Sequence, residues 1–178
     1  MEQASVASET SPSPDAMSAE VTALLTALTS QRRHVLGLLD GLPDEALRRS
    51  VLPSGWVPLG LVRHLALDVE RFWFRAVVGG EAVELETGDA AWHIPPGVSS
   101  EEIFALYRQE IEIADAIIAS RSADSEAASW PEEIFPGLPR RKLRQTILHV
   151  ITETACHAGH LDAARELADG RLWLVIPD

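Results

Sequence analysis

The sequence contains 178 residues, which is enough for one domain with a sizeable hydrophobic core. Its formal net charge is −12, the opposite of the basic surface that binds nucleic-acid phosphates, so we expect no nucleic-acid partner. No apolar run reaches the roughly 18 residues that a membrane span requires, so we expect no membrane partner either.

Residues 1–17 are rich in serine, proline, alanine and glutamate and carry too few large apolar side chains to form a core. We therefore predict a flexible N-terminal tail over this segment. The remainder, residues 18–178, is predicted to form a single domain.

Four long helices are predicted from apolar residues that recur every three to four positions. The first is predicted over Ser18–Asp40, followed by a short helical turn over Asp44–Arg48. The second is predicted over Val57–Val78 and has a proline in its first turn. The third, Ser99–Ser120, opens with a capping box, and the fourth is predicted over Pro139–Ala168. Long irregular connections join the later helices and no comparable strand pattern is present, so the predicted fold class is all-α, a four-helix bundle.

Three other segments carry weaker signals. The basic cluster Arg140–Arg144 opens the predicted fourth helix, and we interpret it as a solvated face rather than an anion-binding site. The apolar segment Trp173–Ile176 is predicted to pack on the bundle. The aromatic residues Trp56, Phe72 and Trp73 are predicted to belong to the core rather than to a substrate platform.

The most informative feature is the set of His149, Glu153, His157 and His160 on the predicted last helix. At about 100° per residue, with His149 at 0°, the other three lie at roughly 40°, 80° and 20°. All four side chains therefore share one face, at the border of the apolar stripe of the same helix. Glu153 and His157 are one turn apart, so their side chains can close on one ion.

His64, on the second predicted helix, supplies a further candidate ligand beside an apolar stripe. Antiparallel packing of the two helices would bring together His64, Glu153 and His157. Two imidazoles and one carboxylate leave an open coordination position, which is typical of catalytic divalent-metal sites. Two alternatives remain open: His160 can replace Glu153 as the partner of His157, and His149 lies on the same face.

Other polar residues near these ligands are expected to support the site. Asp68, one turn after His64, is predicted to orient the ring of that histidine. His149 and His160, where they are not ligands, are expected to support the ligands or face the substrate, and the same is predicted for Arg71. Arginines near the site could offset the negative net charge for an anionic substrate group. The arginines considered for this role are Arg63, Arg71 and Arg75.

The segment Gly55–Leu65 reads Gly-Trp-Val-Pro-Leu-Gly-Leu-Val-Arg-His-Leu, and Glu153–Gly170 opens with Glu-Thr-Ala-Cys-His-Ala-Gly-His. Together they resemble the DinB/YfiT-like metalloprotein superfamily, and in more detail its mycothiol-dependent branch, the zinc-binding mycothiol S-transferases and maleylpyruvate isomerase. The resemblance covers Thr22–Leu172. It implies a four-helix bundle that holds one divalent metal through His64, Glu153 and His157. Zinc is the expected metal, with nickel or another divalent ion as alternatives.

The resemblance also implies an enzyme that uses mycothiol, or a similar thiol, as co-substrate. A metal with an open position can deprotonate a bound thiol, and the thiolate can then attack a small electrophile. Two other functions stay open: a metal-dependent hydrolase that uses bound hydroxide, and a non-catalytic metal-binding bundle that dimerises. A homodimer is expected. The lone Cys156 excludes a disulfide within the chain and no secretory signal is visible, so we expect a cytoplasmic protein.

Overall fold

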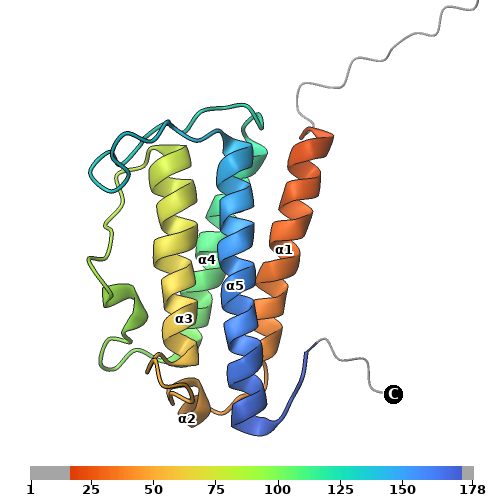
Figure 1. Cartoon of the computed structure of the whole chain (residues 1–178), viewed down its shortest axis with the longest axis vertical. Coiled ribbons are helices and arrows are strands. Elements are labelled where there is room, and N and C mark those ends of the chain that lie inside the picture. The colour runs from red at the N-terminus through yellow and green to blue at the C-terminus, as the bar shows by residue number, and fades with distance from the viewer. Residues whose placement is uncertain (1–16, 174–178) are drawn as a thin grey trace, which may run out of the picture.

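The computed structural model describes residues 17–173 and shows a bundle of long helices (Figure 1). The first helix is α1 (Ala19–Leu39), followed by the short α2 (Asp44–Leu47). Next come α3 (Pro58–His64), which runs directly into η1 (Leu65–Gly79), and the single turn η2 (Ala90–Trp92). The bundle is completed by α4 (Ser100–Ala119) and α5 (Leu143–Asp169).

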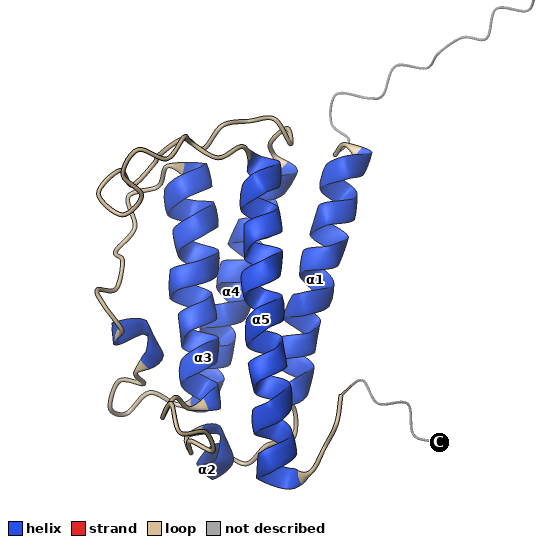
Figure 2. Ribbon diagram, in the orientation of Figure 1, coloured by secondary structure: helices blue, strands red, loops and turns tan. Residues whose placement is uncertain are grey.

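The described residues contain no β-strand, only an isolated bridge between Glu126 and Lys142, so the predicted all-α bundle is confirmed (Figure 2). The rod formed by α3 and η1 lies beside α5, which in turn lies beside α1, while α4 packs behind them (Figure 1). No helix in residues 17–173 is long and apolar enough to cross a membrane. The tail predicted for residues 1–17 lies, apart from Met17, outside the described part of the chain.

The first and third long helices begin at their predicted starts, each after a serine cap. The Ser18 hydroxyl accepts a hydrogen bond from the Val21 backbone N–H at 3.2 Å, and this caps the N-terminus of α1. At α4 the capping box predicted from Ser99 and Glu102 is formed in both directions. Pro58 is the first residue of α3, where its missing N–H leaves no helical hydrogen bond unmade.

The last helix begins at Leu143, so the prediction that it starts at Pro139 was wrong. Residues 139–142 are extended because their backbone is bound to the preceding loop: the Ala127 N–H donates to the Arg141 carbonyl at 3.0 Å, and the Leu143 N–H donates to the Ser125 carbonyl at 2.8 Å. Most of the basic cluster therefore precedes the helix. Arg144, inside the first turn, pairs with Glu20 and with an acid of the loop before α5.

The second predicted helix changes character halfway along. It is α-helical up to His64 and then π-helical through η1, which the apolar spacing did not predict. Apolar residues occupy most sides of this segment, so their spacing cannot distinguish an α-helix from a π-helix. The helix type is instead determined by packing against α4 and α5. In a π-turn each N–H bonds five residues back, so side chains four to five apart come nearly into line.

A cluster of buried charges joins three of the helices inside the bundle. Arg32 of α1 is 2% exposed and donates to both carboxylate oxygens of Glu70 on η1 at 2.7 and 2.6 Å. It also donates to Asp115 on α4 at 2.7 Å. Burial alone would lower the pKa of the Arg32 guanidinium, and the two carboxylates more than reverse this, so its pKa stays above the ordinary value.

The C-terminal aromatic segment is described only as far as Trp173. Its indole stacks on His34 with ring centroids 5.4 Å apart, and it crosses α1 at Gly37, where any side chain would collide with the ring. Trp173 therefore packs on the bundle as predicted, while residues 174–176 lie outside the described range. His34 also contacts Asp162 of α5 at 3.1 Å.

The buried pair generates a stability prediction. Replacing Arg32 with methionine keeps the apolar stem and removes the charge, which leaves Glu70 buried without a counter-ion. We expect a loss of about 3–5 kcal/mol in the free energy of unfolding, measured by urea denaturation followed by circular dichroism.

Arg144→Met is the matched control, because it removes an arginine from a more exposed ion pair. Its expected cost is below about 1 kcal/mol. Equal losses for the two variants would show that the buried pair does not hold the helices together.

Candidate metal centre

His64, Glu153 and His157 meet between the α3–η1 rod and α5. Each offers one ligand atom, and these three atoms all lie within 4.8 Å of one another. Within residues 17–173 this is the group of histidine, cysteine and acidic side chains that is close enough to hold a metal ion. The antiparallel packing expected from the sequence does bring these three side chains together, and the geometry includes neither His149 nor His160 in the cluster.

The hydrogen bonding of His64 fixes which ring nitrogen is free. Its Nδ1 lies 2.9 Å from Oδ2 of Asp68, one turn further along the same rod. An ionised carboxylate can only accept hydrogen bonds, so Nδ1 carries the proton and donates it. In the neutral ring Nε2 is then left with a lone pair, and it is buried without a hydrogen-bond partner in the described part of the protein. Nε2 of His64 is therefore a buried nitrogen whose lone pair is available to a metal ion.

His157 is 9% exposed, and its Nε2 lies 3.3 Å from Oε1 of Glu153. Burial lowers the pKa of His157, and the neighbouring His64 and His160 lower it further against the opposing effect of Glu153. The neutral imidazole is therefore favoured. This is the form that can bind a metal, since protonation would occupy the lone pair.

A tryptophan covers the two imidazoles. The Trp92 indole stacks on His64 with ring centroids 4.2 Å apart and an interplanar angle of 17°, and it meets the edge of His157 at 5.5 Å. The turn η2 comes this close because Gly60 of α3 has no side chain to collide with the Trp92 carbonyl. Arg63 holds the same turn by donating to the Ala90 carbonyl at 2.6 Å and pairing with a loop glutamate.

Trp92 was missed in the sequence analysis because it lies in an irregular connection with no periodicity. The sequence signal that could have indicated it is Gly60, in the first turn of the predicted second helix. A glycine inside a helix can mark a place where another segment of backbone approaches closely.

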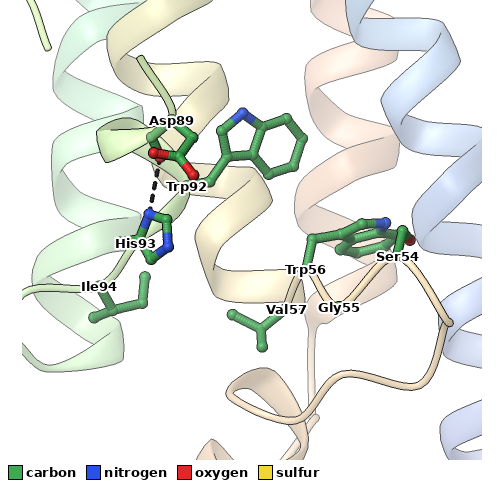
Figure 3. Close-up of a pocket in the computed structure, with 8 residues that line it drawn as sticks. All are labelled: Ser54, Gly55, Trp56, Val57, Asp89, Trp92, His93 and Ile94. Carbon is green, nitrogen blue, oxygen red and sulfur yellow. Dashed lines mark hydrogen bonds between the residues drawn. The ribbon is translucent and has the colours of Figure 1, made fainter. Parts of the chain in front are cut away.

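A cavity of about 470 Å³ opens beside the cluster (Figure 3). Its lining comes from the loop before α3 and from the segment around η2. The lining residues are Ser54, Gly55, Trp56, Val57, Asp89, Trp92, His93 and Ile94. Trp56 lines this cavity and also packs against the core, as Phe72 does, and Trp73 is buried, so the prediction that these three aromatic residues belong to the core is confirmed.

The other two histidines of the α5 stripe lie on either side of the cluster along the helix. His160 is exposed, with its ring centroid 5.7 Å from that of His157 and 6.3 Å from that of Trp56. His149 lies at the opposite end, edge-on to Trp73 at 4.6 Å. Burial lowers the pKa of His149, and the nearby Arg141 guanidinium lowers it further.

The three arginines considered for an anionic substrate are occupied by acids or carbonyls. Arg71 donates to Glu110 of α4 at 3.0 and 2.8 Å, and Arg75 donates to the same carboxylate at 3.1 Å. Arg63 is engaged with the η2 turn, as described above. None of these contacts is with the ligand cluster, so the charge near the cluster comes from carboxylates such as Asp68 and Glu153.

A family model described as Mycothiol-S-transferase matches residues 23–170, more than half of the chain. No curated protein matches the sequence. The matched range contains His64, Glu153 and His157 as well as both tryptophans of the cavity.

The ligand cluster predicts that metal binding requires Glu153 of α5 and does not require His160 of the same helix. Glu153→Ala removes one of the three converging atoms, so zinc affinity should fall by at least about tenfold, measured by competition with a chromophoric chelator. His160→Ala, which changes the same face of α5 outside the cluster, is the control and should retain zinc affinity close to that of the unchanged protein. Full affinity in Glu153→Ala with a loss in His160→Ala would favour the alternative pair of His157 and His160.

The surroundings of His149 predict a pH effect. Its folded-state pKa lies below the ordinary 6.5, so between these two values the unfolded chain binds more protons than the folded one. The contribution of His149 to stability is therefore complete above pH 6.5 and is lost as the pH falls through the folded-state pKa. We expect the His149 ring resonances to titrate below 6.5 in NMR spectra.

Arg141→Met should move that pKa upward, because it removes the nearby positive charge, while Arg140→Met on the exposed neighbour should leave it unchanged. A His149 titration at or above 6.5 in the unchanged protein would contradict this account.

Proposed function

The chain belongs to the mycothiol S-transferase family within the DinB/YfiT-like superfamily, and from this we propose that it is a metal-dependent enzyme that transfers a mycothiol-type thiol to a small electrophile. The observation that carries the metal dependence is the convergence of His64, Glu153 and His157 within 4.8 Å. The family supports the thiol, and the donor set supports the metal.

Two features of the site support a divalent metal independently of the family match. The buried Nε2 of His64 has a lone pair and no partner in the described residues. Two ligands about 2.1 Å from one ion at the tetrahedral angle stand roughly 3.4 Å apart. The 3.3 Å between Nε2 of His157 and Oε1 of Glu153 matches that separation. Imidazole nitrogen and carboxylate oxygen are ligands that zinc accepts, and three of them leave one position for a substrate atom.

When bound, the metal would lower the pKa of a thiol at its open position and so supply a thiolate at neutral pH. The protein residues prepare that reaction. Asp68 holds the His64 ring in the tautomer with Nε2 free, and Trp92 shields both imidazoles from water. His160 lies exposed beside His157, where its imidazole can accept the thiol proton.

The reaction then requires few further groups from the protein. The thiol sulfur forms a bond to the electrophilic carbon of the acceptor, and the electron pair displaced there leaves with the leaving group or takes up the proton held on His160. Because the arginines of the α3–η1 rod are paired with acids, the acceptor that fits best is one that is uncharged at its reacting centre. The zinc, the homodimer and the cytoplasmic location remain part of this proposal.

The proposal predicts an activity that depends on both thiol and metal. The purified protein should transfer mycothiol to an electrophile such as monochlorobimane, and prior removal of metal with a chelator should reduce the rate at least about 100-fold, as should His64→Ala. Because the metal lowers the thiol pKa, the rate should persist below the free thiol's own pKa near about 8.5.

His34→Ala is the matched control, since this histidine of α1 contacts Asp162 and Trp173 and lies outside both the cluster and the cavity, so the variant should leave metal content unchanged. Equal rates with and without metal would refute the mechanism. Ester or amide hydrolysis that needs metal but no thiol would support the hydrolase instead.

A further inference from the structure

A second group of polar and aromatic side chains lies at the end of the bundle where α5 begins. The connection between α4 and α5 crosses this end of the bundle (Figure 1). It brings Trp130 and Phe135 against Trp73 of η1, with ring centroids 6.4 and 5.6 Å from that of Trp73. The guanidinium carbon of Arg141 lies 4.8 Å from the centre of the Trp73 ring, and His149 meets the edge of this ring at 4.6 Å. Trp73 therefore gathers these four side chains in one place.

Arg141 differs from the rest of the basic cluster in the direction of its side chain. Arg140 and Lys142 are exposed, as expected for a solvated face, whereas Arg141 is half-buried. The backbone is extended here, so successive side chains point to opposite sides. The Ala127 N–H, which donates to the Arg141 carbonyl at 3.0 Å, holds this strand-like segment beside the loop that carries Trp130. Arg141 is thus turned toward the aromatic group.

The charge of Arg141 is not neutralised by an acid. Arg71 and Arg75 of the neighbouring rod pair with Glu110, whereas Arg141 forms no ion pair within residues 17–173. Its Nη1 is buried there without a hydrogen-bond partner. The face of Trp73 attracts the guanidinium but accepts none of its hydrogen bonds in the plane of the N–H groups. Arg141 therefore offers a positive charge and a donor to an anion.

Trp130 supplies a second donor without an acceptor. It is 7% exposed, and its indole Nε1 is buried without a hydrogen-bond partner in the described part of the chain. An indole nitrogen can only donate, so the missing partner is an acceptor. A buried donor left without an acceptor destabilises a protein, so a group of this kind normally holds a ligand or an ordered water.

We propose that Arg141 and Trp130 form a carboxylate site that holds the acid group of an aromatic acceptor substrate. A carboxylate presents two oxygens to the two donors, and its single charge matches the one guanidinium. The rings of Trp73, Trp130 and Phe135 suit an aromatic body next to that acid group. A phosphate dianion would require more donors and more positive charge than this group contains.

The place of this site along α5 connects it with the metal cluster. His149 contacts Trp73 and lies four residues before Glu153, which is about 6 Å along a helix. A para-substituted benzoate can span such a distance, with its acid group at Arg141 and its electrophilic carbon toward the cluster. That carbon is uncharged, in agreement with the acceptor proposed above. The assignment to the acceptor rests on the proposed function, whereas binding of an aromatic carboxylate does not.

Residues 131–138 form the cover of this site. The Phe135 ring stacks on Trp73 and lies 5.5 Å from Trp130. The backbone hydrogen bonds described for this segment are local, such as the donation from the Phe135 N–H to the Pro131 carbonyl at 3.0 Å. Ile134 is exposed and leaves most of the outer surface of the loop without packing. A ligand can therefore enter by displacing the Phe135 ring while the long helices keep their places.

The test measures binding of benzoate to the full chain without added metal, followed through the indole N–H groups in proton–nitrogen correlation NMR spectra. We expect the Trp130 N–H resonance to move downfield on saturation, because this group then donates to a carboxylate. Arg141→Met should raise the Kd at least about tenfold. Arg140→Met, which removes the exposed neighbour, is the matched control and should leave the Kd unchanged.

Trp130→Phe keeps an aromatic ring and removes the donor, so it remains informative if Arg141→Met does not fold. It should raise the Kd about threefold, while Trp173→Phe at the other end of α5 should not change it. Benzamide, which lacks the charge, should bind at least about tenfold more weakly than benzoate. Equal binding of benzamide or tighter binding of inorganic phosphate would overturn the proposal. So would the absence of benzoate binding, which is expected if an ordered water satisfies the donors.

Activity measurements separate this inference from the proposed function. The acceptors are para-(chloromethyl)benzoate and para-(chloromethyl)benzamide, with mycothiol as the thiol. The thiol sulfur bonds to the methylene carbon, chloride leaves with the electron pair of the broken C–Cl bond, and the thiol proton passes to His160. A Cys156→Ser background is used, because that exposed thiol could itself react with the acceptor.

We expect KM for the benzoate to be about tenfold below KM for the benzamide, with similar kcat values. Arg141→Met should remove this difference, and Arg140→Met should preserve it. Equal KM values for the two acceptors in the Cys156→Ser protein would overturn the carboxylate site and leave thiol transfer intact. Benzoate binding that depends on Arg141, without transfer to either acceptor or to monochlorobimane, would support the carboxylate site and refute the proposed function.

Discussion

The buried guanidinium of Arg32 is the constraint on which the arrangement of the bundle depends. Its planar fork binds Glu70 through two parallel hydrogen bonds and reaches Asp115 with a further donor, so it joins α1, η1 and α4 at one point. A pair this deeply buried tolerates little displacement, because a shift that breaks it leaves a desolvated charge. The rotation of the η1 rod about its axis is fixed by this contact.

The fixed rotation determines where the other polar residues of the rod point. With Glu70 directed to α1 and α4, His64 and Asp68 lie on the side that meets α5. There the hydrogen bond to Asp68 fixes the orientation of the His64 ring and leaves the lone pair on Nε2. His64 and Asp68 come from the α3–η1 rod, while Glu153 and His157 come from one face of α5.

Two close contacts give the cluster an apolar cover and a cavity. Gly60 allows the η2 turn to approach α3, and Arg63 holds the turn in that position. Trp92 then shields the imidazoles and forms a wall of the cavity. The same contacts occupy Arg63, which directly precedes His64 in the chain, so the region is aromatic and acidic rather than basic. This favours an acceptor that is uncharged at its reacting centre, as proposed above.

The sequence by itself determined the four long helices, two of their caps, and the polar stripe of α5, because these follow from local periodicity and short-range hydrogen bonding. It also identified His64, Glu153 and His157 as candidates. Only the tertiary structure decided that these three converge while His149 and His160 lie outside the cluster, since a stripe shared by four residues cannot select among them. It also decided the π-helical form of η1, the start of α5 at Leu143 and the placement of Trp92 over the imidazoles. Each of these depends on contacts between segments far apart in the chain, and such contacts leave no periodic signal in the sequence.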